Sequence, residues 1–115
     1  MLNIKDIGIF HQQCFIDGGW LDADSGESIV IRNPATGETL GTVPKMGAAE
    51  TRRAIDAANA ALPGWRAKTA GERAKLLRRW HELMLTHQDD LALIMTSEQG
   101  KPLAEAKGEI AYAAS

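Results

Sequence analysis

The chain has 115 residues, of which 44% are hydrophobic and 24% are charged; its formal net charge is −2 and it has one cysteine. This composition is typical of a globular protein and excludes disorder over the whole length, while no apolar run is long enough for a membrane span and no signal peptide is visible. A single cysteine excludes an internal disulfide and a Cys-rich metal centre, so we expect a cytoplasmic chain that forms one domain or part of one.

Residues 11–46 are predicted to form short strands joined by turns, after a flexible N-terminus at 1–10. Asp17-Gly18 is typical of a tight hairpin turn, and the turn at 33–37 contains a proline and a glycine. The predicted strands cover residues 15–16, 20–21, 28–32 and 39–43. Two-stranded ribbons of this kind are marginally stable unless another layer covers them.

Residues 47–115 are predicted to form four helices. The first is expected to stop at Pro63-Gly64, and the second to begin at a capping box in which Thr69 and Glu72 lie three residues apart. Each has apolar residues at helical spacing. In the first helix these are Ala54, Ile55, Ala58, Ala61 and Leu62, and in the second they are Leu76, Leu77, Trp80, Leu83 and Met84.

The third helix is expected to start at a Thr86 cap, with Asp89 in its first turn, and to end at Gly100. Pro102 can open the fourth helix. No stop signal follows before Ser115, so we expect the sequence to be cut inside this helix. The residues expected to be buried are Leu91, Ile94 and Met95 in the third helix and Leu103, Ala106 and Ile110 in the fourth.

The apolar faces of these helices have no sheet within the sequence to cover. A free domain of this length should bury about two-thirds of its extended-chain surface, and each large apolar side chain left half exposed forfeits roughly 1–2 kcal/mol. We therefore expect the faces to pack against a missing segment, and the chain alone to be loosely packed and prone to associate.

Positive charge is concentrated in one window. Residues 52–79 hold eight Lys and Arg against two Asp and Glu, a net charge of +6. Such a window could attract nucleic acid or an acidic partner, but it has no aromatic or glycine pattern for reading bases. A solvated helix face is the interpretation we favour, and a stand-alone helical binding module remains the alternative function.

Candidate catalytic side chains are few. Cys14 could act as a nucleophile only beside an organised base, and alternation along a strand would turn His11 to the opposite face. We therefore expect Cys14 to be a small buried apolar side chain. His81 and His87 are six residues apart, whereas the zinc-protease motif needs histidines four apart on one helix face, so they do not predict a zinc site.

Other residues that could bind a ligand have simpler structural interpretations. The three tryptophans, which include Trp65 and Trp80, are expected to be packing anchors. Asp89-Asp90 could bind a cation, but acidic residues are favourable in the first turn of a helix for electrostatic reasons alone. We therefore assign no ligand to either group.

Four motifs occur in a recognisable order. They are Phe-Ile-Asp-Gly-Gly-Trp at 15–20, Asn-Pro-Ala-Thr-Gly-Glu at 33–38, Ala-Ile-Asp-Ala-Ala-Asn-Ala-Ala at 54–61 with Trp65, and Glu-Gln-Gly-Lys-Pro-Leu-Ala-Glu-Ala-Lys-Gly-Glu-Ile at 98–110. In this order and spacing they resemble the N-terminus of the NAD(P)-dependent aldehyde dehydrogenases. Within the family the sequence most resembles bacterial succinate-semialdehyde dehydrogenases, with glutarate-semialdehyde dehydrogenases as near relatives.

The resemblance implies an α/β fold of which the chain is an incomplete piece: β-hairpin ribbons at 11–46, followed by a four-helix segment at 47–115 that belongs to the cofactor-binding domain. It implies oxidation of an aldehyde, with NAD or NADP as cofactor, through a cysteine thiohemiacetal and a thioester. The implied partners are the rest of the enzyme chain and further copies in a homo-oligomer, with no nucleic acid and no membrane.

The resemblance places the catalytic and cofactor-binding residues outside this sequence, and Cys14 does not match the family's nucleophile. We therefore expect no catalytic, cofactor-binding or metal-binding residue within 1–115, and an inactive fragment. One cation candidate follows from the family, which in some members holds a monovalent ion near positions matching Glu98 and the Arg32 carbonyl. We favour a solvated acid at a helix end for Glu98.

Overall fold

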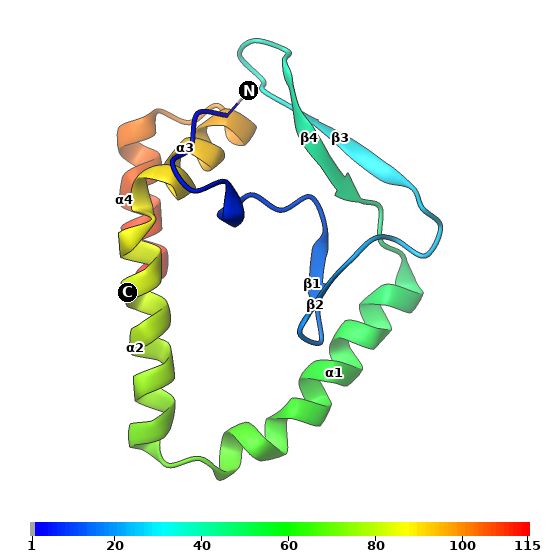
Figure 1. Cartoon of the computed structure of the whole chain (residues 1–115), viewed down its shortest axis with the longest axis vertical. Helices are drawn as coiled ribbons and strands as arrows, with labels where there is room; N and C mark the ends of the chain where they lie inside the picture. The colour runs from blue at the N-terminus through cyan, green and yellow to red at the C-terminus, as the bar shows by residue number, and fades with distance from the viewer. Residues whose placement is uncertain (1) are drawn as a thin grey trace.

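A computed structural model describes residues 2–115. Two antiparallel hairpins precede four helices, as the sequence predicted, and a short 3-10 helix, η1, lies near the N-terminus (Figure 1). The elements are η1 Ile7–Ile9, β1 Cys14–Ile16, β2 Gly19–Leu21, β3 Ser28–Arg32, β4 Thr39–Pro44, α1 Ala48–Ala67, α2 Ala70–Thr86, α3 Gln88–Gln99 and α4 Leu103–Ala114.

The strands form two separate ribbons rather than one sheet. β1 pairs with β2 with Phe15 opposite Trp20, and β3 pairs with β4 with Ile29 opposite Val43. The turn between β1 and β2 has φ of 50° at Asp17 and 77° at Gly18, which are the positive values that an Asp-Gly hairpin turn needs. Both predicted hairpins are therefore confirmed, including their turns.

Helix α1 corrects one prediction, because Pro63 does not stop it. The helix continues for four more residues and ends at Ala67. Pro63 donates no backbone hydrogen bond, but it and Asn59, whose carbonyl loses that partner, lie on an exposed segment where water can replace the bond. The missing hydrogen bond therefore does not end the helix at this position.

The junction between α2 and α3 corrects a second prediction. Thr69 caps α2 as expected, accepting the Glu72 amide at 3.2 Å. Thr86, expected to cap α3, is instead the last residue of α2, where its hydroxyl donates to the Glu82 carbonyl at 2.8 Å. His87 is the shared cap between the helices. Because that hydroxyl is used inside α2, α3 begins without a side-chain cap.

The buried core is small and lies between α3 and α4. It consists of Ala92, Ala106 and Ile110, with Leu91 and Met95 packed against it. Ile94 is half-buried. Leu103 was expected on the same face but is 42% exposed, because it is the first residue of α4 and lies beyond the end of the contact.

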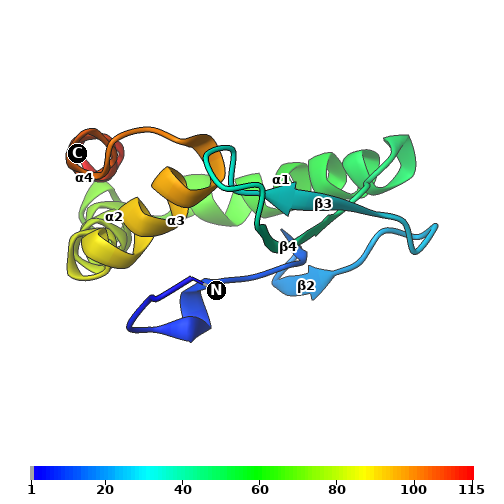
Figure 2. The ribbon, with the colours of Figure 1, turned by 90° about the horizontal axis from the view of Figure 1, so that it is seen from above.

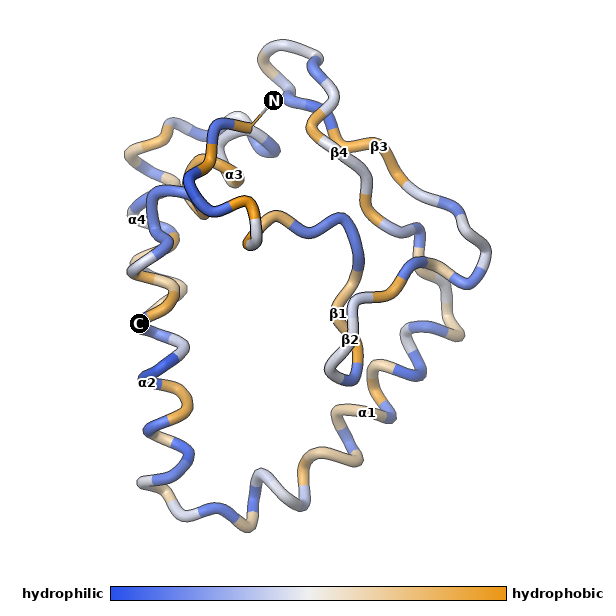
Figure 3. The backbone as a smooth tube through the Cα atoms, viewed as in Figure 1, coloured by the Kyte–Doolittle hydropathy of each residue, from blue (hydrophilic) through white to orange (hydrophobic). Residues whose placement is uncertain are grey.

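The remaining apolar faces are open to solvent. Helix α2 carries exposed apolar residues that we call the α2 stripe; they are Leu76, Leu77, Trp80 and Leu83. Trp80 is 64% exposed, and Trp20 and Trp65 are also exposed, so the tryptophans do not anchor a core among residues 2–115. The accessible surface is 8172 Å², against about 6,100 Å² for a compact monomer of 12.4 kDa. Figure 2 shows the resulting flat arrangement, and Figure 3 shows apolar residues recurring along both long helices.

The dimensions agree with this open arrangement. The principal extents are 48 × 36 × 20 Å and the radius of gyration is 16.5 Å, whereas a compact domain of 100 residues has a radius of gyration of about 13 Å. Over the described residues, every helix is too short or too polar to cross a membrane. Helices α1 and α2 diverge from their short connection, and the β1–β2 ribbon lies beside α1, away from α2 (Figure 1).

Candidate functional site

The candidate nucleophile Cys14 is not paired with a base. His11 stacks on the indole of Trp20, with ring centroids 3.6 Å apart and planes 5° from parallel, and Phe15 meets the same indole edge-on. Cys14 is a free thiol that is partly exposed rather than fully buried, which corrects the expectation of a buried side chain. The His11 imidazole lies against the Trp20 indole, and the described contacts of this hairpin include no Cys–His pair.

The two histidines of the rejected zinc motif contact different parts of the chain. His81 Nδ1 lies 2.9 Å from the Ala114 carbonyl at the end of α4. His87 Nδ1 lies 3.9 Å from Asp6 Oδ2 near the N-terminus. They therefore act as separate contacts between α2 and its neighbours, as their spacing indicated.

The cation candidate joins Glu98 to the Arg32 backbone carbonyl, and it stays a prediction. Glu98 is exposed near the end of α3. The Arg32 side chain bonds within its own turn, where the guanidinium donates to the Gly37 carbonyl at 3.2 Å and to the Thr39 hydroxyl at 2.9 Å. Gly100 ends α3 with φ of 83°, which confirms the predicted left-handed terminator.

An open groove of about 800 Å³ lies between α2 and the end of α4, and we call it the α2–α4 groove. Its apolar wall belongs to the α2 stripe, and His81 bridges it to α4. The surface is apolar, exposed and continuous along the helix, which are properties of a packing face rather than of a catalytic pocket. The lining residues are Ala74, Leu77, Arg78, Trp80, His81, Met84, Ala113, Ala114 and Ser115.

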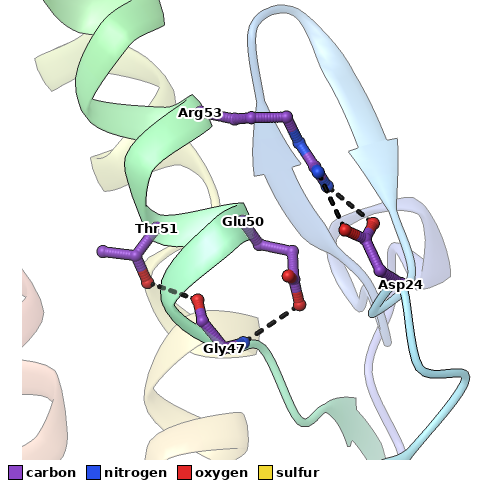
Figure 4. Close-up of polar contacts among 5 residues, drawn as sticks. All are labelled: Asp24, Gly47, Glu50, Thr51 and Arg53. Carbon is purple, nitrogen blue, oxygen red and sulfur yellow. Dashed lines mark hydrogen bonds and ion pairs between the residues drawn. The ribbon is translucent and has the colours of Figure 1, made fainter.

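The start of α1 carries three polar contacts (Figure 4), one of which is the 2.9 Å bond from the Thr51 hydroxyl to the Gly47 carbonyl. Glu50 is 5% exposed and its Oε2 accepts the Gly47 amide at 3.0 Å. The Arg53 guanidinium donates two hydrogen bonds to the Asp24 carboxylate, at 2.8 and 2.7 Å. These bonds hold the pKa of Asp24 below its usual range. The spacing of Gly47 and Glu50 could have revealed the contact between them, whereas nothing local predicts a pair 29 residues apart.

Asp90 forms the most buried acidic contact with the N-terminal segment. Its side chain is in the first turn of α3, as predicted, and is 6% exposed. Oδ1 accepts the Lys5 amide and Oδ2 accepts the Asp6 amide, each at 2.9 Å. These two backbone N–H groups hold the pKa of Asp90 below its ordinary value. Sequence analysis placed this residue correctly but missed its partners, 84 and 85 positions away.

The model of the aldehyde dehydrogenase family matches residues 20–115. The chain therefore belongs to this family.

Within the family, the chain is similar to semialdehyde dehydrogenases of bacteria. The chain is 68% identical over 114 residues to the glutarate-semialdehyde dehydrogenase of Pseudomonas aeruginosa, and 66% identical to the NADP(+) succinate-semialdehyde dehydrogenase of Escherichia coli; each alignment covers 99% of this chain. In both cases the chain spans 24% of the relative's length.

Solved structures agree with the sequence matches. An NADP-dependent enzyme of E. coli superimposes with a TM-score of 0.96 at 66% identity, covering 98% of this chain and 24% of that one. A succinate-semialdehyde dehydrogenase of Burkholderia pseudomallei gives 0.94 at 64% identity, covering 98% and 23%. The ribbons and four helices are thus the arrangement of about a quarter of an aldehyde dehydrogenase.

Proposed function

We propose that residues 1–115 form the leading part of an enzyme that oxidises a semialdehyde to its acid with NAD or NADP. Succinate semialdehyde is the first substrate to test, and glutarate semialdehyde the second. Two observations support the proposal. The alignments cover 99% of this chain and 24% of the length of each of two semialdehyde dehydrogenases. In addition, the α2 stripe is left open to solvent.

The reaction expected of such an enzyme uses residues outside this sequence. A cysteine thiol adds to the aldehyde carbon to give a thiohemiacetal, the hydride leaves to the nicotinamide, and water hydrolyses the resulting thioester. Cys14 has no part in this scheme, since the reacting cysteine is expected outside residues 1–115. Residues 1–115 supply no catalytic, cofactor-binding or metal-binding group in the proposal.

The contribution of this chain is a packing surface. The α2–α4 groove and the exposed α2 stripe would bind the rest of the enzyme, because desolvating Leu77, Trp80 and Leu83 is worth roughly 1–2 kcal/mol each. The completed chain would work in the cytoplasm as a homo-oligomer. The isolated fragment would have no dehydrogenase activity.

The alternative of a stand-alone binding module is not supported by any comparison. Within the basic window, Arg53 is already paired with Asp24, and Arg79 lies 4.0 Å from Glu82. The window is therefore partly neutralised inside the chain, and we do not propose nucleic acid as a partner.

A graft tests the proposal. Residues 1–115 replace the matching residues of the E. coli succinate-semialdehyde dehydrogenase, and NADPH formation is followed with each semialdehyde. We expect the graft to keep activity within about tenfold of its parent and to keep the parent's substrate preference, because the catalytic residues come from the parent. The 115-residue chain alone serves as the negative control.

Two results would contradict the proposal. A graft that is soluble and assembled but inactive would show that this segment does not fit the enzyme. Dehydrogenase activity of the 115-residue chain alone would show that catalytic residues lie within it.

A further inference from the structure

The N-terminal segment, residues 5–12, crosses from the start of α3 to the β ribbons (Figure 1). At one end the buried Asp90 carboxylate accepts the Lys5 and Asp6 amides, each at 2.9 Å. At the other end Gln12 Oε1 accepts the Thr42 amide of β4 at 2.8 Å. Both anchors connect residues far apart in the sequence. In both, the donors are backbone N–H groups, so it is substitution of the acceptor side chain, Asp90 or Gln12, that removes an anchor.

Glycine at position 41 permits the second anchor. A Cβ at Gly41 would lie 2.6 Å from Gln12 Oε1 and 3.3 Å from Phe10 Cζ, so a side chain there would displace the Gln12 amide that makes the anchor. The segment is therefore seated on β4 as well as hydrogen-bonded to it. Gly41 is not one of the glycines with a positive φ, so the close approach of the Gln12 side chain is the physical reason for a glycine at this position.

We propose that residues 5–12 form a strap that couples the start of α3 to the β3–β4 ribbon, closed by the Asp90 carboxylate at one end and by Gln12 at the other. The strap holds two layers that share few other contacts, since the ribbon touches the helices chiefly between β3 and α3. Loosening either anchor should therefore loosen the other. This inference does not depend on enzyme activity.

The charged groups around Asp90 determine how the strap responds to pH. Lys5 and Lys107 lie near Asp89, at 3.8 and 2.8 Å, and His87 lies 3.9 Å from Asp6. The pKa of Asp90 lies below its ordinary value of 3.8, so its contribution is fully present above that value and is lost as the pH falls through the lowered pKa. The Asp90 carboxylate accepts both strap amides, so opening of this end on acidification belongs to Asp90.

Hydrogen exchange of individual amides tests the coupling, in the graft and in the 115-residue chain. Asp90→Asn should lower the protection of the Lys5 and Asp6 amides at least about tenfold, since bonds to a charged acceptor are lost. If the strap couples its ends, Thr42 should also lose protection, by about threefold or more. Glu105→Gln, at an exposed acid in the first turn of α4, is the matched control and should change neither end.

The reverse experiment starts at the other anchor. Gln12→Ala should expose Thr42 and lower the protection of Lys5 and Asp6, whereas Gln13→Ala should not. The amides of Ala92 and Ala106 report whether α3 and α4 stay folded. Should Asp90→Asn disturb them, acidification of the unsubstituted chain from pH 7 through the lowered pKa of Asp90 replaces it, and the Lys5 amide must lose protection before Ala106 does.

Purely local losses, in which Asp90→Asn leaves Thr42 protected and Gln12→Ala leaves Lys5 protected, would overturn the coupling. Unchanged protection of Lys5 and Asp6 in Asp90→Asn would remove the anchor itself. Neither result bears on whether the graft oxidises aldehydes.

Discussion

At the residue scale, two glutamates make the same bond in different surroundings. Glu50 accepts the Gly47 amide at the start of α1, and Glu72 accepts the Thr69 amide at 2.7 Å at the start of α2. Glu50 is buried, whereas Glu72 is exposed. Because the Glu50 side chain is buried and the Glu72 side chain is not, we expect burial of the carboxylate, rather than bond length, to decide which glutamate contributes more to stability.

We predict that Glu50→Ala destabilises the first turn of α1 by about 1–2 kcal/mol, because the Gly47 amide loses a hydrogen bond to a charged and buried carboxylate. Glu72→Ala should cost about half as much or less. Amide exchange at residues 47–53 and 69–75 of the graft measures both local openings. Equal losses at the two sites would show that burial makes no difference here.

At the element scale, Pro63 is the least expected feature of the helices. It lies inside α1 on an exposed stretch, where it removes one backbone hydrogen bond. Pro63→Ala should therefore stabilise the helical conformation of residues 59–67 by up to about 3 kcal/mol. Gly64→Ala should stabilise it by no more than about 1 kcal/mol.

Exchange rates across 59–67 in the graft test this ranking. Slower exchange in Pro63→Ala than in Gly64→Ala is the expected order. Faster exchange in Pro63→Ala would indicate that the ring itself packs against the rest of the enzyme.

The elements also show what sequence patterns can and cannot predict. Local chemistry located the Asp17-Gly18 turn, the Thr69 cap and the Gly100 terminator, because each depends on residues within one turn of chain. Patterns failed where the outcome depends on solvent exposure or on a competing partner, as at Pro63 and at Thr86. The contacts of Asp90 and of Arg53 were missed because both join distant segments.

At the scale of the whole molecule, the apolar faces should have opposite effects in two contexts. In the 115-residue chain, exposed Leu77 and Trp80 promote association, because that is the available way to remove them from water. In the graft the same side chains would be buried and would stabilise the enzyme.

We predict that Trp80→Ser lowers self-association of the 115-residue chain and lowers the thermal stability of the graft. Sedimentation velocity measures the first and a melting curve of the graft the second. Lys75→Ser, an exposed polar position on the same helix, is the control and should leave both unchanged. A monomeric 115-residue chain with a cooperative melt would show that the faces do not need a cover.

The separation of the strands into two ribbons has a consequence for chains of this length. Every one of these strands has a pairing partner on one side only, so each ribbon presents two rows of backbone groups with unfilled hydrogen-bonding capacity. β3 and β4 add exposed Ile29, Val30 and Val43 to such rows. Docked in a larger enzyme, a row of this kind can accept a strand from a neighbouring segment or subunit; free in solution, it is a template for cross-β growth.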